Sequence, residues 1–155
     1  MNTKGKVISV NISEKKGVIK NPVKKINVCS TGVEKDAHAG NWHRQVSLLA
    51  KESISRFEQV LKREIVYGEF AENITTEGLI LFDMTPGDRI KIGGEVLLEV
   101  TQIGKKCHGD GCAIFSAVGK CVMPKEGIFC KVITNGTVGA DDEIIYLPAN
   151  KAELQ

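Results

Sequence analysis

Four of the chain's five cysteines lie within one stretch, TQIGKKCHGDGCAIFSAVGKCVMPKEGIFC, which runs from residue 101 to residue 130. They are Cys107, Cys112, Cys121 and Cys130, and His108 directly follows the first. Thiols in such an arrangement can form a metal site, a disulfide framework or part of a buried core, or one of them can act as a reactive sulfur. An odd number of cysteines leaves one unpaired, and a reducing compartment disfavours disulfides, so the disulfide framework is the weakest of these interpretations.

Cys107 is the thiol whose neighbours in the sequence most favour reactivity. It follows an expected strand end at residues 100–103 and is flanked by Lys106 and His108. Cationic neighbours lower the pKa of a thiol and favour the thiolate. The surroundings therefore predict either a soft metal ligand or a sulfur carrier in the persulfide form, with an incidental loop cysteine as the alternative.

A dedicated zinc or iron–sulfur site is a competing interpretation of the same stretch. The spacing C-H-x3-C-x8-C-x8-C lacks the two close pairs that structural zinc sites usually present. Cys107, His108 and Cys112 still supply a possible set of three ligands. Cys29 and Cys130 each follow an apolar run, and both are predicted to be small core residues.

Short β-type segments dominate the rest of the chain. Residues 6–13 alternate, with Ile8, Val10 and Ile12 as the expected core face. Further extended segments are expected at 17–20, 24–30, 45–50 and 70–78, with a hairpin at 88–103 around Gly93-Gly94 and a last pair at 127–148 around Asn135-Gly136.

Helix is predicted at two places only. Residues 52–64 put Ile54, Phe57, Val60 and Leu61 on one stripe, and residues 112–119 form a shorter candidate. Many short strands with one or two short helices predict a mostly β, barrel-like fold in a single domain, 1–155, with its core at about 5–147.

Composition limits the functional classes. The 155 residues are 42% hydrophobic and 26% charged, and the net charge of +2 gives no indication of a nucleic-acid partner. No apolar run has the length of a membrane span, and the first twenty residues lack the apolar centre of a signal peptide. A cytoplasmic protein without a membrane or nucleic-acid partner is expected.

Three segments resemble the MOSC domain, the module named for the C-terminal domain of molybdenum cofactor sulfurase. They are GEFAENITTEGL, PGDRIKIGGEVLLEVTQIGKKCH and MPKEGIFCKVITNGTVGADDEI, and the chain is most similar to the small stand-alone bacterial members. The resemblance implies a MOSC-type barrel with one key cysteine after the EVTQ strand, which corresponds to Cys107. It also implies molybdenum cofactor (molybdopterin) as the ligand, with Cys107 as metal ligand or sulfur carrier.

The resemblance also gives meaning to polar residues elsewhere. Asp36, His38, His43 and Arg44 match an early loop of the family, where imidazoles and a guanidinium could bind a phosphate or a pterin. Glu72 and Asn73 either line the cofactor pocket or hold their own loop. The full set of expected cofactor-binding residues is Asp36, His38, His43, Arg44, Glu72, Asn73, Lys106 and His108.

The function expected from the resemblance is cofactor binding or sulfur carriage in the maturation or use of molybdenum cofactor. The expected partner is a sulfur donor such as a cysteine desulfurase, a molybdoenzyme or a molybdopterin biosynthesis protein. One alternative is a molybdenum-dependent reductase of N-hydroxylated compounds that needs a partner electron donor. The other is a non-catalytic thiol metal-binding module that uses Cys107, His108, Cys112 and Cys121.

Overall fold

A computed structural model describes residues 3–16, 18–104 and 126–149, and these residues form a mostly β fold with one α-helix. The elements are β1 (Lys4–Ile12), β2 (Asn21–Val23), β3 (Lys25–Cys29), β4 (Gly32–Val33), β5 (Val46–Ala50), α1 (Lys51–Leu61), β6 (Ile74–Glu77), the 3-10 helix η1 (Leu81–Asp83), β7 (Arg89–Ile92), β8 (Val96–Ile103), β9 (Ile128–Thr134), β10 (Gly136–Gly139) and β11 (Glu143–Leu147).

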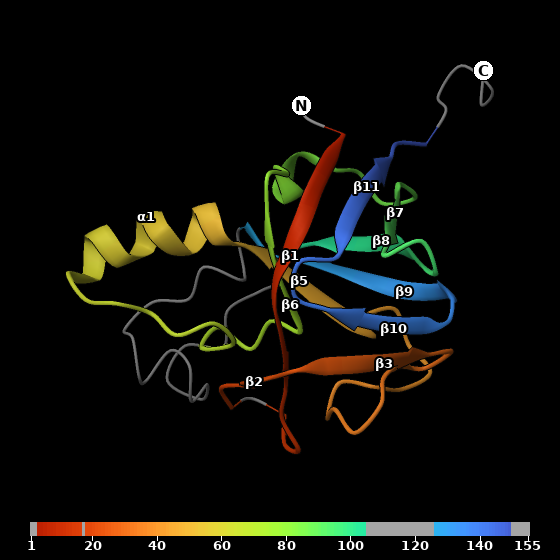
Figure 1. The fold of residues 1–155 in the computed structure, drawn as a ribbon, viewed down its shortest axis with the longest axis horizontal. Coiled ribbons are helices and arrows are strands. Elements are labelled where there is room, and N and C mark those ends of the chain that lie inside the picture. The colour runs from red at the N-terminus through yellow and green to blue at the C-terminus, as the bar shows by residue number, and fades with distance from the viewer. Residues whose placement is uncertain (1–2, 17, 105–125, 150–155) are drawn as a thin grey trace.

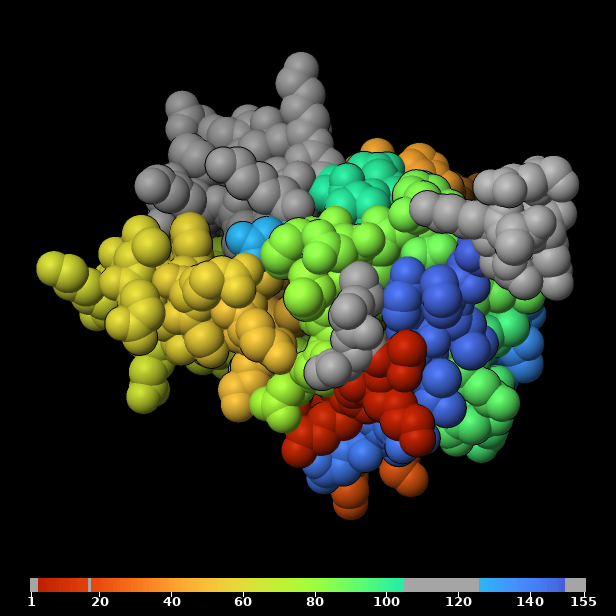
Figure 2. Space-filling model, turned by 90° about the horizontal axis from the view of Figure 1, so that it is seen from above, coloured from red at the N-terminus to blue at the C-terminus, as the bar shows by residue number. Residues whose placement is uncertain are grey.

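Seven of these strands close into a barrel, which confirms the predicted fold class. Their order is β11-β7-β8-β9-β5-β6-β1, and the pairing of β1 with β11 completes the ring (Figure 1). All neighbours in the ring are antiparallel except β5 and β6. A second sheet, β10-β3-β4, packs against the barrel, while β2 pairs with the far end of β1. The space-filling view shows β1 and β11 side by side and α1 projecting from the barrel (Figure 2).

Two apolar clusters stabilise this arrangement. The larger cluster takes side chains from all seven barrel strands and from the small sheet. The smaller cluster joins Leu49 of β5 and Phe129 of β9 to Ile54 of α1 and to Phe70. Because successive side chains of a strand point to opposite faces, Leu48 enters the larger cluster and Leu49 the smaller one. Strand β5 is therefore buried on both faces, which accounts for its uninterrupted run of buried residues.

The predicted core face of β1 is wrong in its first half. Val7 is fully buried in the larger cluster, whereas Ile8 is only half-buried. The pairing of β1 with β6 shifts register between Val7 and Ser9. A bulge of this kind inserts one extra residue and exchanges the faces on either side of it, so Val7 and Val10 both face the barrel interior.

Helix α1 confirms the predicted helix at 52–64, with one difference in its buried face. Ile54, Phe57 and Leu61 pack into the smaller cluster, but Val60 is 61% exposed. The helix ends at Leu61, three residues before the predicted end, and the next residue, Lys62, has a left-handed backbone with φ 55°. Val60 lies outside the buried stripe because the helix is covered on one narrow side only.

Of the two predicted hairpins, only one forms. Strands β7 and β8 pair across Gly93-Gly94 as expected. Strands β9 and β10 do not pair with each other, since β9 lies between β8 and β5 while β10 pairs with β3. Asn135 is thus the corner at which the chain leaves the barrel for the small sheet.

The strand expected at 17–20 is also displaced, because the extended residues that pair with β1 are Asn21–Val23.

Candidate functional site

Asp36 anchors the loop between β4 and β5 through a buried ion pair. Its Oδ1 accepts hydrogen bonds from Lys20 Nζ at 2.8 Å and from the Ser13 amide at 3.0 Å, and both side chains of the ion pair are fully buried. Its Oδ2 accepts from the His38 amide at 3.0 Å. Burial by itself raises the pKa of Asp36, but the hydrogen bond and charge of Lys20, together with the two amides, hold it below its ordinary value. Asp36 therefore stays ionised and fixes this loop to the N-terminal segment.

His38 shares the same buried ammonium. Its Nδ1 lies 3.0 Å from Lys20 Nζ, and its side chain is 14% exposed. Because an ammonium group can only donate, Nδ1 is the acceptor, and the neutral ring carries its proton on Nε2.

Trp42 is the centre of an aromatic and cationic cluster. Its indole Nε1 donates to the His38 carbonyl at 2.8 Å, and its ring lies parallel to the His38 ring with 6.5 Å between centroids. The His43 ring meets it edge-on at 6.0 Å. Two cations also lie over the indole, Lys16 Nζ at 5.1 Å and the Arg44 guanidinium at 5.0 Å. The indole thus holds cations in place through their attraction to its π face.

Arg44 contributes a buried hydrogen-bond donor, Nε, that has no acceptor among the described residues. Its guanidinium lies between the rings of Trp42 and Phe129, 5.8 Å from the latter. Its Nε is buried and has no hydrogen-bond partner among the residues that the structure describes. A buried donor without an acceptor costs about 1 to 3 kcal/mol, so an anion that binds here would remove that cost.

The loop is docked against the ends of β8 and β9. His43 Nε2 and Gln102 Oε1 are 2.8 Å apart, and Gln102 Nε2 donates to the Gly104 carbonyl at 2.6 Å. The Thr101 hydroxyl contacts the His43 carbonyl and also the Phe129 carbonyl at 3.0 Å. The structure therefore brings together Asp36, His38, His43 and Arg44 beside the point where the chain leaves β8.

Glu72 and Asn73 belong to a different network, which holds the segment between α1 and β6. Asn73 Oδ1 accepts from the Ser47 amide at 3.0 Å, and its Nδ2 donates to the Asn11 carbonyl at 3.2 Å. Glu72 Oε2 accepts from the Gly68 amide at 3.0 Å and from Thr75 Oγ1 at 2.8 Å. These contacts fix the segment to β1 and β5, and a part for Glu72 and Asn73 in cofactor binding stays a prediction.

Glu72 provides a pH-dependent prediction. Its burial raises the pKa of the carboxyl, while hydrogen bonds to Gly68, Thr75 and nearby amides oppose the increase. A folded-state pKa above the unfolded value gives stability that is fully present below the unfolded pKa and is lost as the pH rises through the folded pKa. Replacing Glu72 by glutamine keeps an acceptor for Gly68 and removes this loss. We expect the free energy of unfolding of the Glu72→Gln variant to vary less than that of the parent between acidic and neutral pH. Urea titrations across that range measure this, and parallel profiles would contradict it.

Several predicted site residues lie outside the described residues. They are Lys106, Cys107, His108, Cys112 and Cys121, together with the helix expected at 112–119. Within residues 3–16, 18–104 and 126–149, no three His, Cys, Asp or Glu side chains converge to hold a metal ion. No helix in this same part of the chain is long and apolar enough to cross a lipid bilayer.

The two cysteines that the structure describes differ from each other. Cys130 is fully buried in the barrel, where burial raises the pKa of its thiol far above the ordinary value, so the predicted core role is confirmed. Cys29 is only half-buried, and its Sγ lies 3.3 Å from Thr31 Oγ1. The predicted core role of Cys29 is wrong, because it lies at the end of β3 where the sheet turns.

Sequence reasoning missed the residues that support the candidate ones. Lysine is usually a surface residue, and the residues next to Lys20 in the sequence do not indicate that it is buried. Gln102 and Phe129 come from β8 and β9, far from the loop in sequence. Of these missed residues, only Trp42 could have been identified from the sequence, since a lone tryptophan among histidines and an arginine can hold cations against its ring.

The chain is similar to known proteins both in its sequence pattern and in its structure. A family model described as MOSC domain matches residues 35–145, a range that contains the whole loop from Asp36 to Arg44. The YuaD protein from Bacillus subtilis has a similar structure, with a TM-score of 0.76 and 18% identity over 95% of this chain and 97% of that one. YiiM from Geobacillus stearothermophilus gives a TM-score of 0.71 and 21% identity over 92% of this chain and 75% of its own. YiiM from Escherichia coli gives a TM-score of 0.71 and 20% identity over 96% of this chain and 72% of its own. No curated protein matches the chain.

Proposed function

The chain belongs to the MOSC domain family, and from that premise we propose that it binds molybdenum cofactor or its molybdopterin precursor, with Cys107 as the metal ligand or sulfur carrier. The observation that supports this most strongly is Arg44, a guanidinium held between two aromatic rings with a buried Nε that has no partner among the described residues. A phosphate-bearing ligand supplies the acceptor that this donor lacks.

Each residue of the loop has a distinct task in this proposal. Arg44 takes an anionic group of the cofactor, and Trp42 holds the guanidinium in position. Asp36 and Lys20 keep the loop fixed whether or not a ligand is present, because their ion pair is buried. His38 and His43 present imidazoles beside Trp42 that suit a flat polar heterocycle. When bound, the cofactor would supply a molybdenum centre for oxygen or sulfur transfer.

In the sequence, Cys107 comes three residues after Gly104, the last described residue beyond β8. Gly104 lies two residues after Gln102, whose side chain contacts His43, and the Gly104 amide donates to the Gly127 carbonyl at 2.7 Å. If Cys107 carries sulfur, its thiolate attacks the terminal sulfur of a persulfide on the donor, such as a cysteine desulfurase. A new S–S bond forms on Cys107, and the thiolate of the donor leaves.

Pterin retention tests the proposal. The protein should be produced in cells that make molybdopterin, purified without oxygen, and analysed for pterin fluorescence and for molybdenum per chain. We expect Arg44→Gln and Cys107→Ala each to lower the retained pterin by about tenfold or more, since each removes a charge-assisted or metal contact. Arg63→Gln is the matched control, because Arg63 pairs with Glu69 on the surface.

Pterin content that is unchanged in both variants would reject the proposal. Intact mass separates the two roles of Cys107. An added sulfur atom that is absent from Cys107→Ala identifies a sulfur carrier, whereas molybdenum without added sulfur identifies a metal ligand.

A further inference from the structure

We infer that a pocket at the start of α1 binds a small monocarboxylate with an apolar body, and that Glu126 occupies the anion position of this pocket when no ligand is bound. The inference concerns a surface separate from the Arg44 cluster and does not depend on cofactor binding. Strand β5 separates the two, since Arg44 precedes its first residue and the pocket begins at Ala50, its last.

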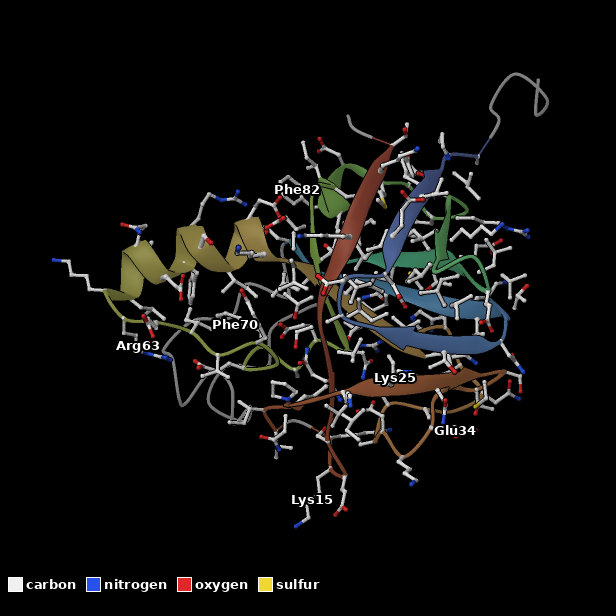
Figure 3. The ribbon with its side chains drawn as sticks, viewed as in Figure 1. Lys15, Lys25, Glu34, Arg63, Phe70 and Phe82 are labelled. Atoms are coloured by element: carbon white, nitrogen blue, oxygen red, sulfur yellow. The ribbon has the colours of Figure 1, made fainter. Side chains whose placement is uncertain are left out.

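The pocket has a volume of about 290 Å³. Its walls come from the β5–α1 junction and from the segment that follows β6, and they comprise Ala50, Glu52, Ser53, Arg56, Gly78, Leu79, Ile80 and Phe82. Figure 3 shows Phe82 on the side of the molecule where α1 begins. Small-molecule sites have volumes of about 300 to 1,000 Å³ and combine apolar walls with a few convergent polar groups. This pocket is at the lower limit, so its size fits a ligand of about one ring.

The anion position is inferred from Glu126, which is not itself a lining residue but whose carboxylate binds two residues that are, Ser53 and Arg56. The Ser53 hydroxyl donates to Glu126 Oε1 at 2.6 Å, and Arg56 Nη2 contacts the same oxygen. Arg56 Nη2 also lies 3.3 Å from Ser53 Oγ, so the two donors converge on one point. Because both donors line the pocket, the position of the Glu126 carboxylate indicates the chemical group that the pocket accepts.

Glu126 can be displaced because its ion pair is open to solvent. The side chain of Arg56 is 58% exposed and that of Glu126 is 27% exposed. Solvent-exposed ion pairs contribute little to stability, so exchange of one carboxylate for another has a low cost.

Apolar side chains beside the anion position bind the apolar part of the ligand. Ile80 is 44% exposed and Phe82 is 38% exposed, while Leu79 forms the buried base. Large apolar side chains that are exposed together at a pocket indicate a binding surface. Glu52 also lines the pocket, and its Oε2 accepts from the Gly78 amide at 2.8 Å. This second negative charge disfavours a dianion, which is why the ligand is a monocarboxylate.

Binding of hydrocinnamate, an aromatic monocarboxylate, tests the inference by titration calorimetry or by NMR titration of the purified chain. The two partners of the ion pair should shift the affinity in opposite directions. We expect Arg56→Gln to raise the Kd by about tenfold or more, because it removes a charge-assisted hydrogen bond to the ligand. We expect Glu126→Gln to lower the Kd by about threefold or more, because it weakens the internal competitor. Phe82→Ser should raise the Kd, since it removes the apolar contact.

Two controls make the outcome decisive. Arg63→Gln removes another surface arginine that pairs with a glutamate, and it should leave the Kd unchanged. The neutral amide of hydrocinnamate should bind neither the parent nor Glu126→Gln. Absence of hydrocinnamate binding in both the parent and Glu126→Gln overturns the inference, and so does a Glu126→Gln affinity equal to or weaker than that of the parent.

Discussion

Replacing Lys20 by methionine is expected to lower the free energy of unfolding by about 3 to 5 kcal/mol, because it leaves the buried Asp36 carboxylate without its counter-charge. Lys20 Nζ donates to Asp36 Oδ1 at 2.8 Å and to Ser13 Oγ at 3.1 Å, and no part of the lysine side chain reaches solvent. Methionine has a similar length but cannot donate a hydrogen bond. Urea denaturation at neutral pH measures the loss.

A surface pair supplies the matched control for this substitution. Lys51 Nζ lies 3.3 Å from Glu77 Oε2, and the two side chains are 41% and 37% exposed. Because solvent screens this pair, Lys51→Met should unfold at nearly the same urea concentration as the parent. The double variant Lys20→Met with Asp36→Leu should recover part of the loss, since no uncompensated charge remains. Equal losses in Lys20→Met and Lys51→Met would contradict a buried pair.

The effect of Lys20→Met should also depend on pH. The pKa of Asp36 lies below its ordinary value in the folded chain, so its stabilising contribution is present above the unfolded pKa and is lost as the pH falls through the folded pKa. Without Lys20, burial dominates and favours the neutral carboxyl. The stability difference between parent and variant should therefore narrow as the pH is lowered toward the unfolded-state pKa of an aspartate, about 3.9.

The limit of sequence reasoning about the fold is clearest in β1. Alternation predicted that Ile8 and Val10 share the core face, but Val7 and Val10 do so, since one extra residue lies between Val7 and Ser9. A period of two carries no information about where it is interrupted. Asn135-Gly136 shows the same limit at a turn, because the residue types favour a bend but do not specify which strands pair after it.

The candidate site was predictable where residue type and sequence proximity coincide. Asp36, His38, His43 and Arg44 lie within nine residues, and the structure places them in one cluster with Trp42. The supporting groups could not be predicted, because Lys20 and Gln102 reach the loop only through the closure of the barrel. The buried hydrogen bonds of Glu72 to Gly68 and Thr75 could not be predicted either. They depend on strand registers that the sequence does not specify.

Gly68→Ala is expected to lower the free energy of unfolding by about 2 to 5 kcal/mol, because backbone strain and steric overlap add at this position. Gly68 has φ +90°, and an added Cβ would overlap the Lys20 carbonyl oxygen and lie 3.1 Å from Asn11 Cβ. Its carbonyl also accepts from the Lys20 amide at 2.8 Å, so the backbone that carries the buried ammonium would have to move.

Gly87→Ala separates the two causes of this loss. Gly87 has a similar φ of +101°, but nothing lies within 4 Å of the added Cβ. It should therefore show the strain alone, about 1 to 2 kcal/mol. Urea denaturation of both variants measures the difference, and equal losses would mean that Lys20 and Gly68 yield to the methyl group without cost. A larger loss in Gly68→Ala would instead show that the Lys20 backbone is rigid, as is required if Lys20 and Asp36 are to fix the loop that carries Arg44 before any ligand binds.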